Sequence, residues 1–152
     1  MTARAKYEVV SDAEGAFSYL NTRFKLLRVE GSQGIVLKRD GKIIAACLYE
    51  NFNRHNVFMH CAGDPSRKWL TRQFLFNAFD YPFNQLKVTR ITLWVESDNA
   101  DSIRFVEHLG FGLEATLHGA GSSGQDALVY VMYRESCQHV RAELLRRGRI
   151  VG

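Results

Sequence analysis

The 152-residue sequence has only three cysteines, only two prolines and no long hydrophobic run. The cysteines are odd in number, and none lies in a C-x-x-C pair, which argues against a disulfide scaffold and a structural zinc site. We therefore expect no bound metal and a location in reducing cytosol. No stretch approaches the roughly 20 apolar residues that span a bilayer, and the first residues lack an apolar segment of signal-peptide length. We expect no membrane-spanning segment.

A strong excess of one charge is also missing. Lys and Arg number 20 against 16 Asp and Glu, so the formal net charge is +4 with the histidines neutral. Much of this excess lies in the last dozen residues, at Arg141, Arg146, Arg147 and Arg149. A basic tail is typical of a solvated helix face. Contact with RNA or with an acidic surface is the weaker alternative.

The apolar residues that are present suffice for one core. They make up 46% of the chain, and folding a chain of roughly 150 residues buries about 70% of the surface that it exposes when unfolded. We find no internal repeat and no linker. We therefore expect a single domain over residues 1–152, with a basic helical tail at about 136–152.

The first half of the sequence predicts a helix and then a three-stranded meander. Residues 12–30 carry apolar side chains at helical spacing, with Ser11 and Asp12 as candidate N-caps. Asp40-Gly41 then separates two apolar runs, which is typical of a tight hairpin whose two turn residues adopt positive φ. A third apolar run at 56–62 completes the meander.

The second half alternates helices and strands. Residues 67–79 have helical spacing and follow a loop with Pro65; we expect Tyr81-Pro82 to end this helix. A β-prone run at 90–95 leads to a second helix, which Gly110 ends as a left-handed cap. The remaining predicted elements are strands at about 111–117 and 127–132.

These elements predict an α+β fold with one mixed, mostly antiparallel sheet and helices on both faces. The strands at 56–62 and 90–95 are joined through a helix. Such a crossover connects parallel neighbours, so we expect one parallel pair at the centre of the sheet.

The segment from Asn99 to Phe111 carries the most specific pattern. It has an Asn at the end of a strand, a short helix, and Leu-Gly-Phe leading into a strand that contains Glu114. This pattern resembles the C-terminal signature of the GNAT superfamily of acetyltransferases. Within the superfamily it is most similar to the branch that acetylates the N-termini of ribosomal proteins and to small phage-encoded relatives. The resemblance implies a GNAT-like domain that uses acetyl-CoA to acetylate an amine directly, with a protein or peptide as the acceptor.

The resemblance also implies where acetyl-CoA binds. The motif Q/R-x-x-G-x-G/A of the superfamily falls on residues 67–72, where Arg67 matches but Leu70 and Arg72 replace the glycines. A helix beginning there offers free N–H groups and cations to a pyrophosphate. In the family the pantetheine lies along the strand before this motif. The expected cofactor contacts are Cys61, Ala62, Arg67, Lys68, Trp69, Leu70, Thr71, Arg72, Asn99 and Ser102.

Direct transfer needs a base for the amine and an acid for the departing thiolate. Val106 stands where many family members carry a Tyr acid, so Ser102 is the candidate donor to the sulfur, with helix capping as its alternative role. Glu50 and His60 are alternative bases, because each falls near the expected acyl site and imidazole exchanges protons near neutral pH. A satisfied core histidine is the structural alternative for His60. Glu96 and Glu114 are weaker candidates.

The sequence leaves the acceptor open. Nothing in the composition selects an α-amine, a lysine or a small-molecule amine, and both a monomer and a homodimer are compatible with it. The alternative function is a non-catalytic GNAT-fold binding module for a host protein or RNA. That alternative rests on the missing glycines and the missing Tyr.

Overall fold

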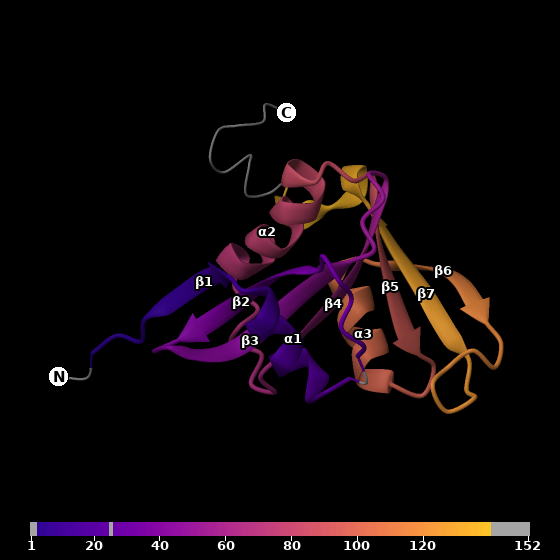
Figure 1. Cartoon of the computed structure of the whole chain (residues 1–152), viewed down its shortest axis with the longest axis horizontal. Coiled ribbons are helices and arrows are strands. Elements are labelled where there is room, and N and C mark those ends of the chain that lie inside the picture. Colours follow the sequence, from indigo (N-terminus) through magenta and orange to yellow (C-terminus); the bar gives the residue numbers. More distant parts are fainter. Residues whose placement is uncertain (1–2, 25, 141–152) are drawn as a thin grey trace.

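The computed structural model describes residues 3–24 and 26–140, so most of the predicted basic tail lies outside the described residues. Within them, one sheet has the strand order β1-β2-β3-β4-β5-β7-β6, with β1 and β6 at its two ends (Figure 1). The strands are β1 (Tyr7–Ser11), β2 (Gln33–Arg39), β3 (Lys42–Glu50), β4 (Asn56–Gly63), β5 (Arg90–Glu96), β6 (Gly112–Leu117) and β7 (Ala127–Tyr133). The helices are α1 (Ala13–Asn21), α2 (Arg72–Asp80), α3 (Ala100–Leu109), a π-helical turn (Tyr81–Gln85) and a 3-10 turn (Arg134–Ser136).

The predicted meander and its turn are confirmed. β2, β3 and β4 pair antiparallel in succession. Asp40 and Gly41 have φ values of 51° and 83°, which is the left-handed geometry that a tight hairpin requires. The Asp40-Gly41 pair therefore sets the register of β2 against β3.

Helix α1 is shorter than predicted. Asp12 caps it by accepting a hydrogen bond from the Gly15 N–H at 2.9 Å, but the helix ends at Asn21 and not near residue 30. The Thr22 hydroxyl donates to the Tyr19 carbonyl, and the Asn21 side chain accepts from a later N–H group. These local bonds compete with the helical ladder and end the helix early.

Strand β1 is an element that the sequence analysis missed. It pairs antiparallel with β2, from Tyr7 opposite Arg39 to Ser11 opposite Ile35. A strand of five residues with one solvated face gives too few alternations of apolar and polar residues to be recognised in a sequence.

The start of α2 differs from the prediction, whereas its end is confirmed. The helix begins at Arg72, five residues late, because Thr71 is its N-cap and accepts from the Phe74 N–H at 3.1 Å. Arg67 has a φ of 58°, which an α-helix does not tolerate. At the other end, α2 stops at Asp80 with Tyr81 as its C-cap, as predicted. A separate π-helical turn follows, and Pro82 stands in its first turn, where proline is tolerated.

Two apolar clusters cover the two faces of the sheet, as predicted. On one face, Ala16 and Leu20 of α1 pack against Val36, Ala46 and Leu48. The other face carries the larger core, which includes side chains of α2 and α3. In the part of the chain that the structure describes, every helix is too short or too polar to span a bilayer.

The predicted parallel pair is confirmed between β4 and β5, at the centre of the sheet. Its register runs from Asn56 opposite Arg90 to Phe58 opposite Thr92. Helix α3 follows β5, with Asn99 as N-cap and Gly110 as a left-handed C-cap at a φ of 110°, also as predicted.

Candidate functional site

A cavity of about 430 Å³ lies where the parallel strands separate. Among the described residues, pairing between β4 and β5 ends at Phe58 and Thr92, although both strands continue. The facing edges beyond that point leave backbone N–H and C=O groups for a ligand that resembles a strand. Residues of β4, β5 and α3 line this slot, among them Met59, His60, Cys61, Trp94, Glu96 and Ser102.

The slot reaches both faces of the sheet. Successive residues of a strand point to opposite faces, and the lining includes the neighbours His60 and Cys61 of β4. On the α3 face it is closed by Asn99, Ser102 and other residues of that helix. On the α1 face it is closed by side chains from the segments that follow α1 and β6, namely Arg23, Phe24, Leu26, Ser122, Ser123 and Gln125. One passage thus connects the two sides.

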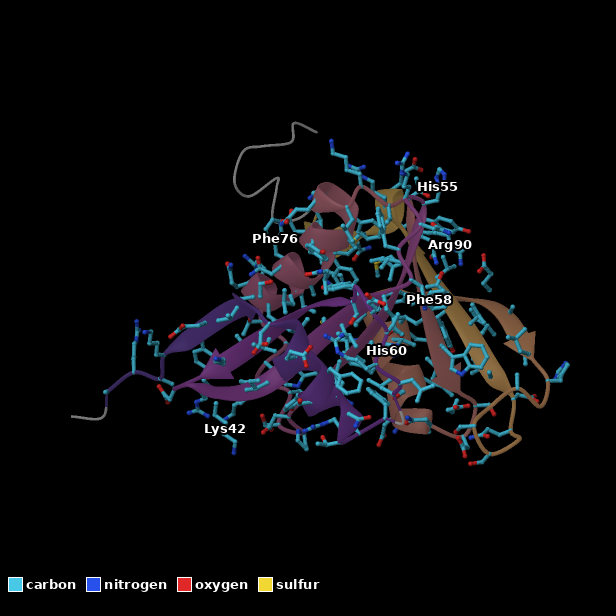
Figure 2. All side chains as sticks on the ribbon, viewed as in Figure 1. Lys42, His55, Phe58, His60, Phe76 and Arg90 are labelled. Atoms are coloured by element: carbon cyan, nitrogen blue, oxygen red, sulfur yellow. The ribbon has the colours of Figure 1, made fainter. Side chains whose placement is uncertain are left out.

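His60 and Glu50, predicted as alternative bases, form one pair. The Nε2 atom of His60 lies 2.6 Å from Oε1 of Glu50. His60 is opposite Leu48 in the ladder, so it is a diagonal cross-strand neighbour of Glu50 on the same face. Both side chains are largely buried, with exposures of 21% and 12%. His60 lines the slot on β4 (Figure 2), and Glu50 reaches the slot only through His60.

The N-terminus of α3 meets the slot on the other face. Asn99 Oδ1 accepts from the Ser102 N–H at 3.1 Å, and both side chains line the cavity. The cap uses the backbone of Ser102 and leaves its hydroxyl for other partners. The positive end of the helix dipole is directed to the same place, where it favours developing negative charge.

An acidic rim lies beside the slot and was only partly anticipated. Glu96 Oε1 accepts from the Ser122 N–H at 3.1 Å, and Asp98 accepts from Gln125 at 3.2 Å. The other oxygen of Glu96 is buried and has no hydrogen-bond partner among the described residues. A Cβ on Gly121 would approach it to 2.5 Å, so the loop backbone lies directly against this carboxylate. Loop contacts of this kind leave no periodic pattern in a sequence.

The segment predicted to bind pyrophosphate lies outside the slot lining. Arg67 to Leu70 precede the N-cap Thr71, and of the predicted residues Arg72 alone lies in the first turn of α2. The N–H groups of Ser66, Arg67, Lys68, Leu70 and Thr71 donate to acceptors in residues 64–69. Helix geometry leaves the N–H groups at the beginning of α2 for an anion. Contact of residues 67–72 with the cofactor therefore stays a prediction.

Trp69 explains why this segment is compact. Its ring is 3% exposed and packs between Phe74 of α2 and Phe105 of α3, at centroid distances of 6.0 and 5.5 Å. Its Nε1–H donates to the Asp64 carbonyl at 2.8 Å. A Cβ on Gly63 would overlap the indole ring, so the ring lies flat on the end of β4. The Trp69 ring, predicted as a cofactor contact, is therefore buried in the core.

Among the carboxylates outside the slot, Asp64 and Glu114 have lowered pKa values. The N–H group and then the hydroxyl of Ser66 lower the pKa of the Asp64 carboxyl by hydrogen bonding. The Arg90 guanidinium binds both oxygens of Glu114 and lowers the pKa of that carboxyl. Glu114, a weaker candidate for the base, thus remains ionised and bound to Arg90 on the open face of β5 (Figure 2).

Metal ligands do not gather in the described residues: they contain no group of three or more His, Cys, Asp or Glu side chains placed to hold an ion.

A central parallel pair that opens into a slot, followed by an Asn-capped helix, is the architecture of GNAT acetyltransferases. The chain belongs to this family: the model of the acetyltransferase (GNAT) family matches residues 3–111. Enzymes of the family use acetyl-CoA as co-substrate. No curated protein matches the chain in sequence.

Solved structures agree with the fold. A variant of the spermidine N-acetyltransferase SpeG from Vibrio cholerae has a TM-score of 0.69 at 15% identity, covering 90% of this chain and 98% of that one. Ard1 from Thermoplasma volcanium has a TM-score of 0.65 at 15% identity, covering 84% and 97%. A dodecameric form of the Vibrio cholerae enzyme has a TM-score of 0.66 at 17% identity, covering 85% and 94%. At these identities the likeness concerns the fold alone.

Proposed function

We propose that this chain transfers acetyl directly from acetyl-CoA to an amine of a protein or peptide. The observation that carries the proposal is the slot between β4 and β5, which brings His60 from one face and the N-terminus of α3 from the other to one cavity. A thioester in this slot would be reached by an acceptor from the α1 face.

The slot supplies what a pantetheine arm needs. Its two amide groups can hydrogen-bond the unpaired edges of β4 and β5, as an added strand does. The thioester end then lies between His60 and Ser102. Arg67, Lys68 and Arg72 are the cations that we assign to the phosphates, with the first N–H groups of α2.

The pair of Glu50 and His60 suits a general base. Glu50 Oε1 faces Nε2 at 2.6 Å and holds a proton there, which leaves Nδ1 as the acceptor. His60 takes a proton from the amine as its nitrogen bonds to the acetyl carbon. The carbon–sulfur bond breaks, and the Ser102 hydroxyl donates to the departing sulfur. In the overall reaction, the acetyl group replaces one hydrogen on the nitrogen of the acceptor, and that hydrogen ends on the thiol of CoA as a proton.

The rim supports a cationic acceptor. Glu96 and Asp98 place negative charge beside the slot, and Trp94, which is 41% exposed, adds an aromatic face. A peptide with a free amine carries such a charge, and so does a polyamine. Because one solved relative is a spermidine N-acetyltransferase, spermidine is the competing acceptor in the test.

The first experiment measures melting of the chain with and without acetyl-CoA. A ligand at 100 times its dissociation constant adds about 2.7 kcal/mol to the free energy of unfolding. We expect a rise in the melting temperature with acetyl-CoA and with CoA. An unchanged melting curve at millimolar concentration of both would withdraw the transferase proposal in favour of a non-catalytic binding module.

The second experiment measures acetyl transfer by mass spectrometry, with a panel of peptides and with spermidine as acceptors. His60→Gln and Glu50→Gln are each expected to lower kcat by about 10²–10⁴-fold, with the cofactor-induced melting shift retained. His55→Gln, on the exposed loop before β4, is the matched control and is expected to keep full activity. If acetyl is transferred to spermidine but to no peptide, the acceptor is a polyamine and not a protein or peptide, while the proposal that the chain is a transferase is retained.

A further inference from the structure

Two cysteines face each other across the ladder that forms one side of the slot. Cys47 of β3 and Cys61 of β4 are direct partners in the antiparallel register. Partners of this kind have Cα atoms about 4.5 or 5.5 Å apart, and disulfides join Cα atoms about 4.4–6.8 Å apart. The two Sγ atoms lie 2.9 Å apart in a hydrogen bond. The backbone therefore already has the spacing of a cross-strand disulfide.

The two thiols differ in access. Cys61 is half-buried and lines the slot, so a small molecule that enters the slot meets it first. Cys47 has no exposed surface. Burial, and next the hydrogen bond to Cys61, raise the pKa of the Cys47 thiol well above its ordinary value. An oxidant that reacts with Cys61 therefore leaves Cys47 beside it as the only thiol in bonding distance within the described residues.

We propose that Cys47 and Cys61 are an oxidisable dithiol that hydroperoxides convert to a reversible disulfide. The Cys61 sulfur attacks the peroxide oxygen, the O–O bond breaks, and Cys61 becomes a sulfenic acid while water or an alcohol leaves. The Cys47 sulfur then attacks Cys61, the S–S bond forms, and a second molecule of water leaves. Two thiols are oxidised and one hydroperoxide is reduced.

The proposal does not depend on the transferase activity, because only the pairing of β3 with β4 and the access through the slot enter it. Oxidation would remove a thiol from the slot wall and join the strand that holds Glu50 to the strand that holds His60. Cys137, which lies beyond β7, serves as an internal reference thiol.

The test treats the reduced full-length protein with hydrogen peroxide, quenches it, denatures it and alkylates the remaining thiols. Intact mass and non-reducing peptide mapping then identify the products. We expect a loss of two hydrogens, one alkylated thiol at Cys137, a cross-linked pair of peptides carrying Cys47 and Cys61, and full reversal by dithiothreitol. Because Cys47 must lose its proton to react, closure is expected to accelerate as the pH rises through the alkaline range.

Cysteine variants test whether Cys61 is oxidised first and Cys47 then closes the disulfide. Cys137→Ser is expected to form the same cross-link at the same rate. Cys47→Ala, which keeps a small apolar side chain in the core, is expected to stop at a Cys61 sulfenic acid that dimedone captures. Cys61 oxidised to sulfinic acid in the wild type while Cys47 stays alkylatable would overturn the proposal. A cross-link that involves Cys137 would also overturn the proposal, and so would three unreacted thiols. Because these results come from the wild-type protein, they decide the question even if a variant fails to fold.

Discussion

The contact between Gly63 and the Trp69 ring allows a sharp test of how the end of β4 is built. Trp69→Ala removes a side chain that is 97% buried, with its hydrogen bond to Asp64. We expect the free energy of unfolding to fall by about 3–5 kcal/mol, the usual range for a large aromatic residue in a core. Gly63→Ala inserts a methyl group into the space of the ring and is expected to cost about 1–3 kcal/mol.

The two changes are expected to be strongly non-additive. With the ring removed, the methyl group at residue 63 has room, and Gly→Ala at a compatible site is neutral or stabilising by up to about 1 kcal/mol. The double variant should therefore unfold at no lower denaturant concentration than Trp69→Ala alone. Gly112→Ala is the matched control, because a Cβ at Gly112 meets nothing within 4 Å.

Urea unfolding followed by circular dichroism measures all four variants, because this signal does not depend on the tryptophan that is removed. Additive costs within about 0.5 kcal/mol would mean that the two residues do not touch. A cost below about 1 kcal/mol for Trp69→Ala would mean that the ring is not part of the core. Either result refutes the packing that we describe for residues 63–71.

Two further predictions concern the capping of α2 and the ion pair on β5. Thr71→Ala removes the cap on the Phe74 N–H and is expected to lower the free energy of unfolding by about 1 kcal/mol in urea, whereas Thr71→Ser should keep most of it; equal stability of the two variants would exclude Thr71 as the cap. Glu114→Gln is expected to cost about 0.5 kcal/mol or less at neutral pH, because solvent screens a pair with side-chain exposures of 25% and 36%. Since Arg90 lowers the pKa of Glu114, that stabilisation is complete above the ordinary carboxyl range and disappears as the pH falls through the lowered value; a difference between wild type and variant that grows on acidification would contradict the pairing.

Much of the fold followed from local chemistry. Asp40-Gly41 and Gly110 adopt positive φ because their turns demand it, and both were predicted at the right residue. The parallel pair followed from the crossover between β4 and β5 alone. The end of α1 was predicted too late, because local side-chain bonds at Asn21 and Thr22 end the helix. The start of α2 was predicted too early, because the Trp69 ring packs on Gly63 and the helix begins only at Arg72, after the N-cap Thr71.

Individual residues of the candidate site could be predicted from the sequence, but the contacts between them could not. Glu50 and His60 were both predicted, as alternative bases, because each falls near the expected acyl site. Their bond depends on the register that sets Leu48 opposite His60, and a register cannot be counted from one strand. Loops without a repeating pattern contribute the remaining walls, so sequence reasoning found no signal for their residues, which are Arg23, Phe24, Leu26, Ser122, Ser123 and Gln125.

The slot is built from rigid strands and from loops that can be replaced. The strands that frame it are held by ladder bonds on their outer edges, so the reacting groups keep their positions. The described loop residues that close it on the α1 face are held by single bonds, such as that from Ser122 to Glu96, and by no ladder, and surface loops tolerate changes of length and composition better than strands do. Under the function that we propose, exchange of these loops would change the acceptor while the strands that frame the slot stay unaltered.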